Sequence, residues 1–189
     1  MPAPRTPDVD APAAFRQQLL GAIPRLRRYA RSLVFDTSAA DDLVQTALER
    51  ALAHWHQFDQ RRDILVWILS IAHNAYMDDR RRHARLPLAD GGDRFGALDE
   101  RHAAHSPDIG LQLDLIAALK QLPVEQREPL LLVTLEQLSY AECAELLRIP
   151  IGTVMSRISR ARVALRALLD GRAPAAAPAV AASSLRRVV

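Results

Sequence analysis

The segment from Leu138 to Leu169 constrains the fold more than any other stretch, because its pattern is that of a short helix, a tight turn and a longer helix. Apolar residues of the longer helix recur at steps of four, three, four and three, which keeps them on one side at about 100° per residue. They are Val154, Ile158, Ala161, Leu165 and Leu168. Serine and arginine fill much of the remaining surface. An apolar back and a basic front predict a helix-turn-helix unit whose second helix enters a DNA major groove.

Start and turn signals precede that longer helix. Ser139 is a suitable N-cap for a scaffold helix from Tyr140 to Leu147, and Glu142, three residues later, completes a capping box. The turn is assigned to residues 148–150, so the second helix begins near the end of that turn.

Basic residues concentrate in two regions. The 189-residue chain has a formal net charge of only +3, so the distribution of charge matters more than its sum. Residues 148–172 contain six arginines against one aspartate, residues 61–85 contain six against three aspartates, and residues 86–108 contain five acids against two arginines. Cations at a helix C-terminus are favourable on dipole grounds alone. That effect does not account for the whole 61–85 cluster, which predicts contact with nucleic acid.

The N-terminal half reads as three helices. The first has apolar residues at three- and four-residue spacing, and Pro24 predicts a kink or a break within it. Capping oxygens at residues 36–38 start the second helix and place Asp41 and Asp42 in its first turn. Residues 57–63 read as a loop before the third helix.

These patterns predict an all-α protein of two small helical domains joined by a flexible linker. The ranges are a disordered N-terminus at 1–12, a first domain at 13–85, an acidic linker at 86–108, a second domain at 109–170 and a flexible tail at 171–189. The linker is recognised by its glycine, proline and acidic residues without sustained periodicity.

Several classes of function find no support. No apolar run approaches the roughly 18 residues that span a bilayer, so a cytoplasmic protein is expected. Cys143 is predicted to be a small buried hydrophobe. His54 and His56 lie on different sides of their helix, which is poor geometry for a shared metal. With no phosphate-binding glycine loop, metal cluster or nucleophile arrangement, we expect neither a cofactor nor an enzyme.

With both halves in view, the chain resembles the extracytoplasmic-function (ECF) sigma factors, which keep only the second and fourth sigma domains. In the first half, DDLVQTALERALAHW is similar to the family's core-binding helix, and WILSIAHNAYMDDRRR is similar to its tryptophan-led minus-ten helix. In the second half, LPVEQREPLLL, LSYAECAELL and IPIGTVMSRISRARVALR match the fourth domain. The resemblance covers about residues 13–169 and implies a reversible RNA polymerase subunit that selects promoters.

By position, the resemblance implies three sets of functional residues. Binding to the beta-prime clamp helices of core polymerase falls to Asp41, Asp42, Leu43, Val44 and Gln45. Recognition of the melted minus-ten element falls to Phe58, Asp59, Arg61, Arg62, Trp67, Asn74, Arg80, Arg81 and Arg82. Recognition of the minus-thirty-five element falls to Arg148, Thr153, Ser156, Arg157, Arg160, Arg162 and Arg166. Within the last set, Ser156, Arg157 and Arg160 would face bases, and Arg148, Arg162 and Arg166 would lie nearer phosphates.

The resemblance also implies partners. They are core RNA polymerase, including its beta flap, promoter DNA, and an anti-sigma factor, often membrane-anchored, that holds the factor inactive. The chain itself is not expected to enter a membrane. Two alternatives stay open: a sigma-mimicking protein that binds an anti-sigma factor, and a ligand-sensing helix-turn-helix regulator. The basic recognition surface argues against the first, and the lack of a sensor pocket in the first half argues against the second.

Two departures from the family pattern concern the residues that read DNA. Met155 stands where the family usually has lysine or arginine, and the angular count puts it at the edge of the buried stripe, where it covers apolar surface or touches a thymine methyl. Residues 63–66 read DILV where the family commonly shows Phe-Arg-Ala, so the residues that hold the minus-ten base are not fixed by the resemblance.

Overall fold

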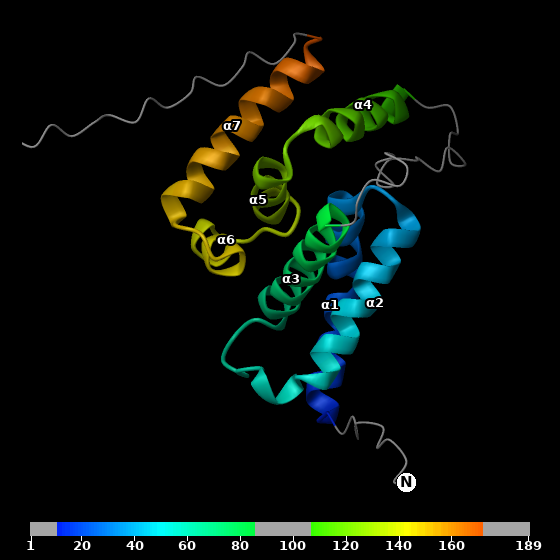
Figure 1. The fold of residues 1–189 in the computed structure, drawn as a ribbon, viewed down its shortest axis with the longest axis vertical. Helices are drawn as coiled ribbons and strands as arrows, with labels where there is room; N and C mark the ends of the chain where they lie inside the picture. The colour runs from blue at the N-terminus through cyan, green and yellow to red at the C-terminus, as the bar shows by residue number, and fades with distance from the viewer. Residues whose placement is uncertain (1–10, 86–106, 172–189) are drawn as a thin grey trace, which may run out of the picture.

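The computed structural model describes residues 11–85 and 107–171. These two ranges form seven α-helices and one short 3-10 helix, with no strand among them, so the predicted all-α class is confirmed. The elements are α1 (Ala13–Val34), α2 (Thr37–Ala53), η1 (Trp55–Gln57), α3 (Ile64–Arg85), α4 (Pro107–Gln121), α5 (Val124–Thr134), α6 (Tyr140–Leu147) and α7 (Ile151–Leu169). We call α1–α3 the N-terminal bundle and α4–α7 the C-terminal bundle (Figure 1). None of the described helices is both long and apolar enough to cross a membrane.

The N-terminal bundle closes around the apolar stripe of α1. Leu26, Tyr29 and Leu33 have no exposed surface, and they share a core with the equally buried Ile68 and Leu69 of α3. Burying each such side chain contributes about 1.5–3 kcal/mol. This stripe therefore fixes how α1 lies against α3.

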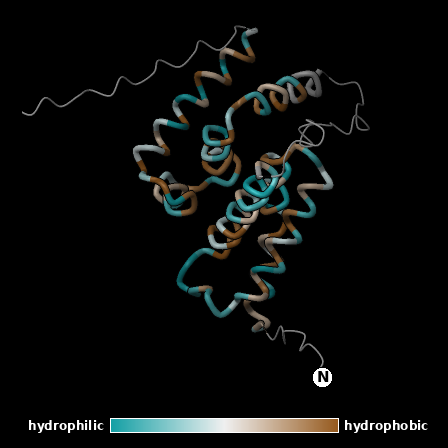
Figure 2. Tube along the Cα trace, in the orientation of Figure 1, coloured by the Kyte–Doolittle hydropathy of each residue, from teal (hydrophilic) through white to brown (hydrophobic). Residues whose placement is uncertain are grey.

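Three aromatic rings pack together at the end of the N-terminal bundle where α1 begins. Phe15 of α1 lies with its ring centroid 5.7 Å from that of Phe58 and 5.9 Å from that of Trp67, and the last two are 5.2 Å apart. Phe58 is only 9% exposed although it lies in the loop that follows η1. Its burial ties this loop to the bundle, while the rest of the loop is hydrophilic (Figure 2).

Two details of the predicted helices are wrong. The sequence predicted a kink or a break at Pro24, and the break does not occur: α1 runs through Pro24, since Leu19, Ala22 and Leu26 hold the buried face on both sides while Pro24 itself is exposed. Helix α2 begins at Thr37, with the Asp36 carboxylate accepting a hydrogen bond of 2.7 Å from the Ala39 amide. The two aspartates of α2 consequently lie beyond its first turn, where the helix dipole helps them little.

The predicted start and turn of the helix-turn-helix unit are confirmed. The Ser139 amide donates to Glu142 Oε2 at 2.8 Å, and the Glu142 amide donates to Ser139 Oγ at 3.2 Å, which completes the capping box of α6. Arg148 ends α6 in a left-handed conformation with φ of 54°, and Pro150 caps α7. On α7, Val154, Ile158 and Ala161 are buried, and Leu165 and Leu168 pack partly buried against the same core.

The two bundles pack against each other. Helix α5 lies on α1, and α6 lies on α3 (Figure 1). The predicted disordered N-terminus, acidic linker and C-terminal tail fall outside the described residues except at their edges. The sequence offered no signal for the contact between the bundles, which brings distant functional segments together.

Candidate nucleic-acid interface

The front of α7 presents polar and basic side chains to solvent. Ser156, Arg160, Arg162 and Arg166 are exposed, whereas Arg157 is half-buried. The Arg160 guanidinium stays on its own helix, donating from Nε to the Ser156 carbonyl oxygen at 3.3 Å. Within the described chain no carboxylate pairs with these arginines, so their charges stay available to a polyanion.

The N-terminal end of the same helix carries apolar side chains on its exposed surface. Ile151 is 46% exposed and Met155 is 47% exposed, one turn apart. Met155 thus lies further from the buried stripe than the angular count placed it. Thr153 beside them is half-buried, and Arg148 at the preceding turn is exposed. A methionine in this position can contact a thymine methyl in a major groove.

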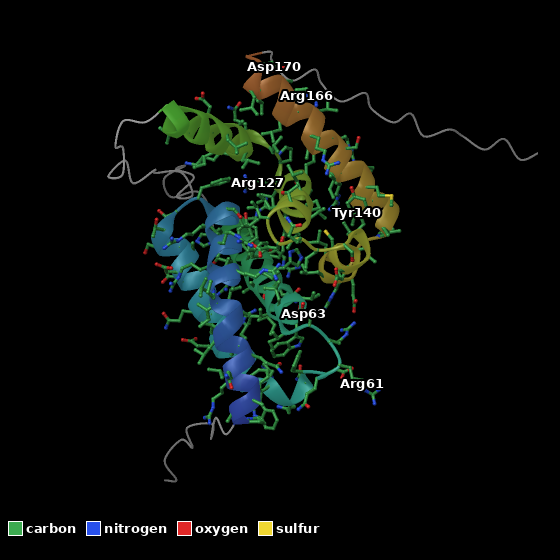
Figure 3. The ribbon with its side chains drawn as sticks, turned by 180° about the vertical axis from the view of Figure 1, so that it is seen from behind. Arg61, Asp63, Arg127, Tyr140, Arg166 and Asp170 are labelled. Carbon is green, nitrogen blue, oxygen red and sulfur yellow. The ribbon has the colours of Figure 1, made fainter. Side chains whose placement is uncertain are left out.

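The loop between η1 and α3 holds most of the predicted minus-ten residues. Asp59 turns back on the loop, its Oδ1 accepting a hydrogen bond of 3.0 Å from the Arg61 amide. The Arg61 side chain points away from the molecule (Figure 3). Arg62 instead pairs with Glu145 of α6. Phe58 belongs to the aromatic core, so it supports the loop from beneath and is not a free wall of a base pocket.

The remaining predicted minus-ten residues follow α3. Trp67 and Asn74 are half-buried, which leaves each a partial surface for contact. At the C-terminal end, Arg80 lies 3.7 Å from Glu125 of α5, and Arg81 lies 2.7 Å from Asp78. Arg82 is exposed and has no carboxylate partner in the described chain.

Asp78 acts as the local counter-ion of this cluster. Its carboxylate accepts hydrogen bonds from Arg81 and from Arg50 of α2, and these bonds lower its pKa below the usual 3.8. It therefore stays ionised at neutral pH and holds part of the arginine cluster in place without neutralising it.

The predicted core-binding segment splits between surface and interior. Asp41, Asp42 and Gln45 are exposed, with Asp41 at 3.4 Å from Arg27 and Gln45 donating to Glu49 at 3.0 Å. The other two members, Leu43 and Val44, are buried. A buried side chain cannot present itself to a docking partner, so their part in the segment is to hold α2 against α1 and α3.

Sequence reasoning missed a set of buried charges where the bundles meet. Glu136, which follows α5, has no exposed surface, and its carboxylate pairs with Arg25 at 3.1 Å and Arg28 at 2.9 Å. Both arginines belong to α1, and the hydrogen bond to Glu136 raises the pKa of Arg28. From the sequence alone, the four arginines on the polar faces of α1, Arg25, Arg27, Arg28 and Arg31, are expected to form a solvated surface, so the sequence carried no sign of this partner.

Glu128 and Arg127 of α5 form the second part of the same junction. Glu128 is 1% exposed; its Oε1 accepts a hydrogen bond of 2.5 Å from the Tyr29 hydroxyl and lies 2.6 Å from Nδ1 of His73. Arg127 donates to the Leu33 carbonyl oxygen at 3.0 Å (Figure 3 labels Arg127 between the bundles). Burial lowers the pKa of Arg127 and raises that of Tyr29 well above its usual value.

A cleft of about 530 Å³ opens beside this junction, between the start of α3 and the helix α6. Arg62, Asp63 and Trp67 line it from the N-terminal bundle, and Glu145 and Arg148 line it from the C-terminal bundle. Figure 3 shows Asp63 at the start of α3, on the side of α6. The cleft thus brings together residues that the sequence assigned to two different DNA elements. Among the described residues no cluster of histidine, cysteine and carboxylate side chains could hold a metal ion.

Two protein families match the chain by sequence. A model described as sigma-70, region 4 matches residues 112–165, and a model described as the sigma2 domain of PhyR matches residues 19–73. The ECF RNA polymerase sigma factor EcfG of Rhodopseudomonas palustris is 35% identical over 157 residues, covering 82% of this chain and 85% of that protein. The ECF RNA polymerase sigma factor SigM of Bacillus subtilis is 31% identical over 146 residues, covering 76% and 87%.

Solved structures have the same arrangement of helices. The sigma factor RpoE in complex with the anti-sigma factor NepR, from Bartonella quintana, matches with a TM-score of 0.66 at 30% identity, over 83% of this chain and 97% of that chain. CnrH in complex with the cytosolic domain of CnrY matches with a TM-score of 0.63 at 27% identity, over 84% and 88%.

Proposed function

The chain belongs to the ECF RNA polymerase sigma factors, and from this premise we propose that it grips promoter DNA at two points: by α7 at the minus-thirty-five element and by the start of α3 at the melted minus-ten element. As a sigma factor it directs promoter-specific transcription initiation. The observation that carries the assignment of α7 is its row of exposed arginines without carboxylate partners, on a helix whose back is buried. It acts in the cytoplasm, where polymerase and promoters are.

In this proposal, some side chains of helix α7 contact bases and others contact phosphates. Ser156, Arg157 and Arg160 contact base edges, where bidentate arginine contacts discriminate bases. The exposure of Ser156 and Arg160 supports this role. Arg148, Arg162 and Arg166 lie toward phosphates, and Thr153 supports the N-terminal turn. Met155 contacts a thymine methyl in place of a phosphate.

Substitutions in α7 test this division. Arg157→Ala and Arg160→Ala are expected to change the preference among minus-thirty-five sequences, because base contacts carry about 1–3 kcal/mol of discrimination each. Arg166→Ala is expected to weaken all promoters alike and to reduce the salt slope by about 1. The measurement is holoenzyme binding to a panel of promoter duplexes at several salt concentrations. Uniform loss in all three variants contradicts the assignment.

At the minus-ten end, the loop from Phe58 to Asp63 receives an extruded base, and α3 holds the strands through Trp67, Asn74 and its terminal arginines. Extruding a base costs a few kcal/mol, which stacking and cationic contacts offset. The outward Arg61 supports this role, as does Arg82, which is exposed and has no carboxylate partner among the residues that the structure describes.

The exposed acidic side of α2 docks on the beta-prime clamp helices through Asp41, Asp42 and Gln45. Asp42→Arg is expected to abolish binding to core polymerase and to leave helix content unchanged by circular dichroism. Asp114→Arg, an equal charge reversal on an exposed residue of α4, is the control and is expected to bind core like the wild type. If Asp42→Arg binds core with wild-type affinity, this docking surface is wrong.

An anti-sigma factor holds this chain inactive in the cell and anchors it at a membrane. RpoE was solved in complex with the anti-sigma factor NepR, and CnrH in complex with the cytosolic domain of CnrY, which supports the proposal. Co-purification from the native cell, with mass spectrometry of the soluble and membrane fractions, tests it. Recovery of the chain with polymerase alone, under inducing and non-inducing conditions, contradicts it.

Run-off transcription distinguishes a sigma factor from a sigma-mimicking protein. The match of residues 19–73 to the sigma2 domain of PhyR is the observation that favours a mimic, since a solved structure describes PhyR as an anti-anti-sigma factor. Purified chain, core polymerase and a promoter library are combined, and specific transcripts are expected. A chain that captures an anti-sigma factor but neither binds core nor initiates from any promoter is a mimic.

A further inference from the structure

Two large apolar side chains lie in solvent at the N-terminal end of α7. Ile151 is 46% exposed and Met155 is 47% exposed, and residues four apart on a helix lie on the same side in successive turns. The back of the helix is buried through Val154 and Ile158, which have at most 1% of their surface exposed. About half of the surface of Ile151 and of Met155 is therefore left for a partner. We call these two residues the exposed pair.

The polar groups in the same turns are engaged with the helix itself. The Ser156 hydroxyl donates a hydrogen bond of 3.0 Å to the Thr153 carbonyl oxygen, and Nε of Arg160 donates to the Ser156 carbonyl oxygen at 3.3 Å. At Gly152, which follows Ile151 in the chain, an added Cβ would meet nothing within 4 Å. This end of α7 therefore presents an open apolar surface.

Arginines continue the side of α7 on which the exposed pair lies. Arg162 and Arg166 come seven and eleven residues after Met155, spacings that keep residues on one side of a helix, and both are exposed. Neither forms an ion pair with a carboxylate of residues 11–85 or 107–171. An apolar end followed by cations is complementary to an anionic ligand that carries apolar groups. A DNA major groove with thymine methyl groups is such a ligand.

The spacing of the exposed pair matches the spacing of bases. The N-terminal residues of a recognition helix are those that reach base edges. Ile151 and Met155 lie four residues apart, which is about 6 Å along the helix axis. Successive bases of one strand lie about 3.4 Å apart. The exposed pair therefore covers about two base steps, while the arginines farther along the same side meet the backbone.

We infer that Ile151 and Met155 recognise the C5-methyl groups of pyrimidines in the minus-thirty-five element. The exposed pair selects thymine over cytosine through the methyl group and without a hydrogen bond. Cytosine methylated at C5 carries the same group at the same place, so the pair recognises it as it recognises thymine. The inference rests on the proposed function. To the contact proposed there for Met155 it adds a second residue and a sensitivity to DNA methylation.

Changing one methyl group in the DNA tests the inference. The wild-type holoenzyme first selects a promoter duplex from a library with a randomised minus-thirty-five element, and each thymine of that element, on either strand, is then replaced in turn by deoxyuridine. Burying one methyl group changes a binding constant about fourfold. The holoenzyme is expected to bind about fourfold more weakly after replacement at one or two neighbouring thymines and equally well after the others. At the sensitive positions, 5-methylcytosine is expected to bind about fourfold more tightly than cytosine.

Matched variants assign the effect to the exposed pair. Ile151→Ala/Met155→Ala is expected to bring the ratio of thymine to deoxyuridine affinity to about 1, because the apolar contact is gone. Met155→Arg supplies the cation that the family usually has at this position, and it is expected to lose the methyl preference at its own base and to raise the salt slope by about 1. The control Val163→Ala shortens an apolar side chain that is 70% exposed on the same helix, about two turns beyond Met155. It is expected to keep the fourfold ratio.

The outcomes separate this inference from the proposed function. Equal affinity for thymine and deoxyuridine at every position overturns the inference, as does a selected element without thymine on either strand. A ratio that persists in Ile151→Ala/Met155→Ala, or one that Val163→Ala abolishes, also overturns it, because the methyl group is then read elsewhere. In all these cases the holoenzyme still binds promoters and the proposed function stands. A holoenzyme that selects no duplex overturns both.

Discussion

At the scale of single residues, the environment decides what a charged or reactive group does. Arg127, Glu128 and Glu136 are acidic or basic residues with almost no exposed surface, a state that is rare unless such groups are paired. Each finds a partner on α1, more than ninety residues away in the chain. The exposed arginines of α7 are charged like Arg127 but have no carboxylate partner among the described residues, which supports their proposed contact with DNA.

The lone cysteine gives a prediction at this scale. Burial raises the pKa of the Cys143 thiol to about 12. Since the thiolate is the reactive form, only about one thiol in 10⁴ is ionised at pH 8. We expect negligible reaction with a thiol reagent in the native chain and complete reaction in denaturant, followed by absorbance. Fast stoichiometric labelling of the native chain at pH 8 would refute this burial.

At the scale of elements, local signals start and end the helices. The capping box at the start of α6 is the sharpest case. Hydrogen bonds from the Ser139 side chain and backbone lower the pKa of Glu142 below its usual 4.5. The ionised carboxylate thus stabilises the folded state above about pH 4.5, and this contribution is lost as the pH falls through the lowered pKa.

Two substitutions test the box. Ser139→Ala is expected to cost about 1 kcal/mol of the free energy of unfolding at pH 7. Glu142→Gln is expected to be destabilising at pH 7 and to approach the wild type as the pH falls below 4.5, because the wild-type carboxylate then becomes protonated. Urea unfolding at several pH values measures both. A pH-independent difference for Glu142→Gln would contradict the ionised cap.

Pro24 within α1 is the second case at this scale. A proline cannot donate the hydrogen bond to the carbonyl four residues back, and it is about 3 kcal/mol less favourable than alanine inside a helix. Pro24→Ala is expected to raise the free energy of unfolding by about 1–2 kcal/mol, since the proline also restricts the unfolded chain. Thermal unfolding measures the change. Gly21→Ala, at an exposed position of the same helix where an added Cβ would meet no other atom within 4 Å, is a suitable control for helix propensity.

At the scale of the whole molecule, the junction couples the two bundles. Tyr29 is fully buried in the core, and its hydroxyl donates to Glu128, so the core of one bundle is connected to a helix of the other. The sequence predicted two small helical domains joined by a flexible linker. The docked bundles are instead expected to unfold together for as long as the junction holds.

Calorimetry tests this coupling. The wild type is expected to show one unfolding transition. Arg25→Glu/Arg28→Glu, which places two carboxylates against Glu136, is expected to show two or a markedly broadened one, because the bundles then unfold separately. Arg16→Glu/Arg31→Glu, which makes the same charge change on exposed residues of α1, is expected to keep a single transition. Two well-resolved transitions in the wild type would show that the junction contributes little to the free energy of unfolding.

The sequence by itself determined the helices and most of the candidate interface. Hydrophobic periodicity and capping are local properties, so the capping box, the buried stripe of α7 and its basic front could be predicted from neighbouring residues alone. The placement of Met155 was less accurate because an ideal helical wheel does not show which neighbours cover its edge.

Only the tertiary structure decided what lies between the bundles. The pairing of Glu136 with Arg25 and Arg28, the burial of Phe58, and the meeting of Arg62 with Glu145 all join segments far apart in the chain. No local pattern encodes such pairs, because a charged residue on a helix is expected to be solvated unless the position of its partner in the folded chain is known. The chain's sequence therefore indicated which surfaces are proposed to meet DNA, and only the fold showed that Arg62 on one of them pairs with Glu145 of the other bundle.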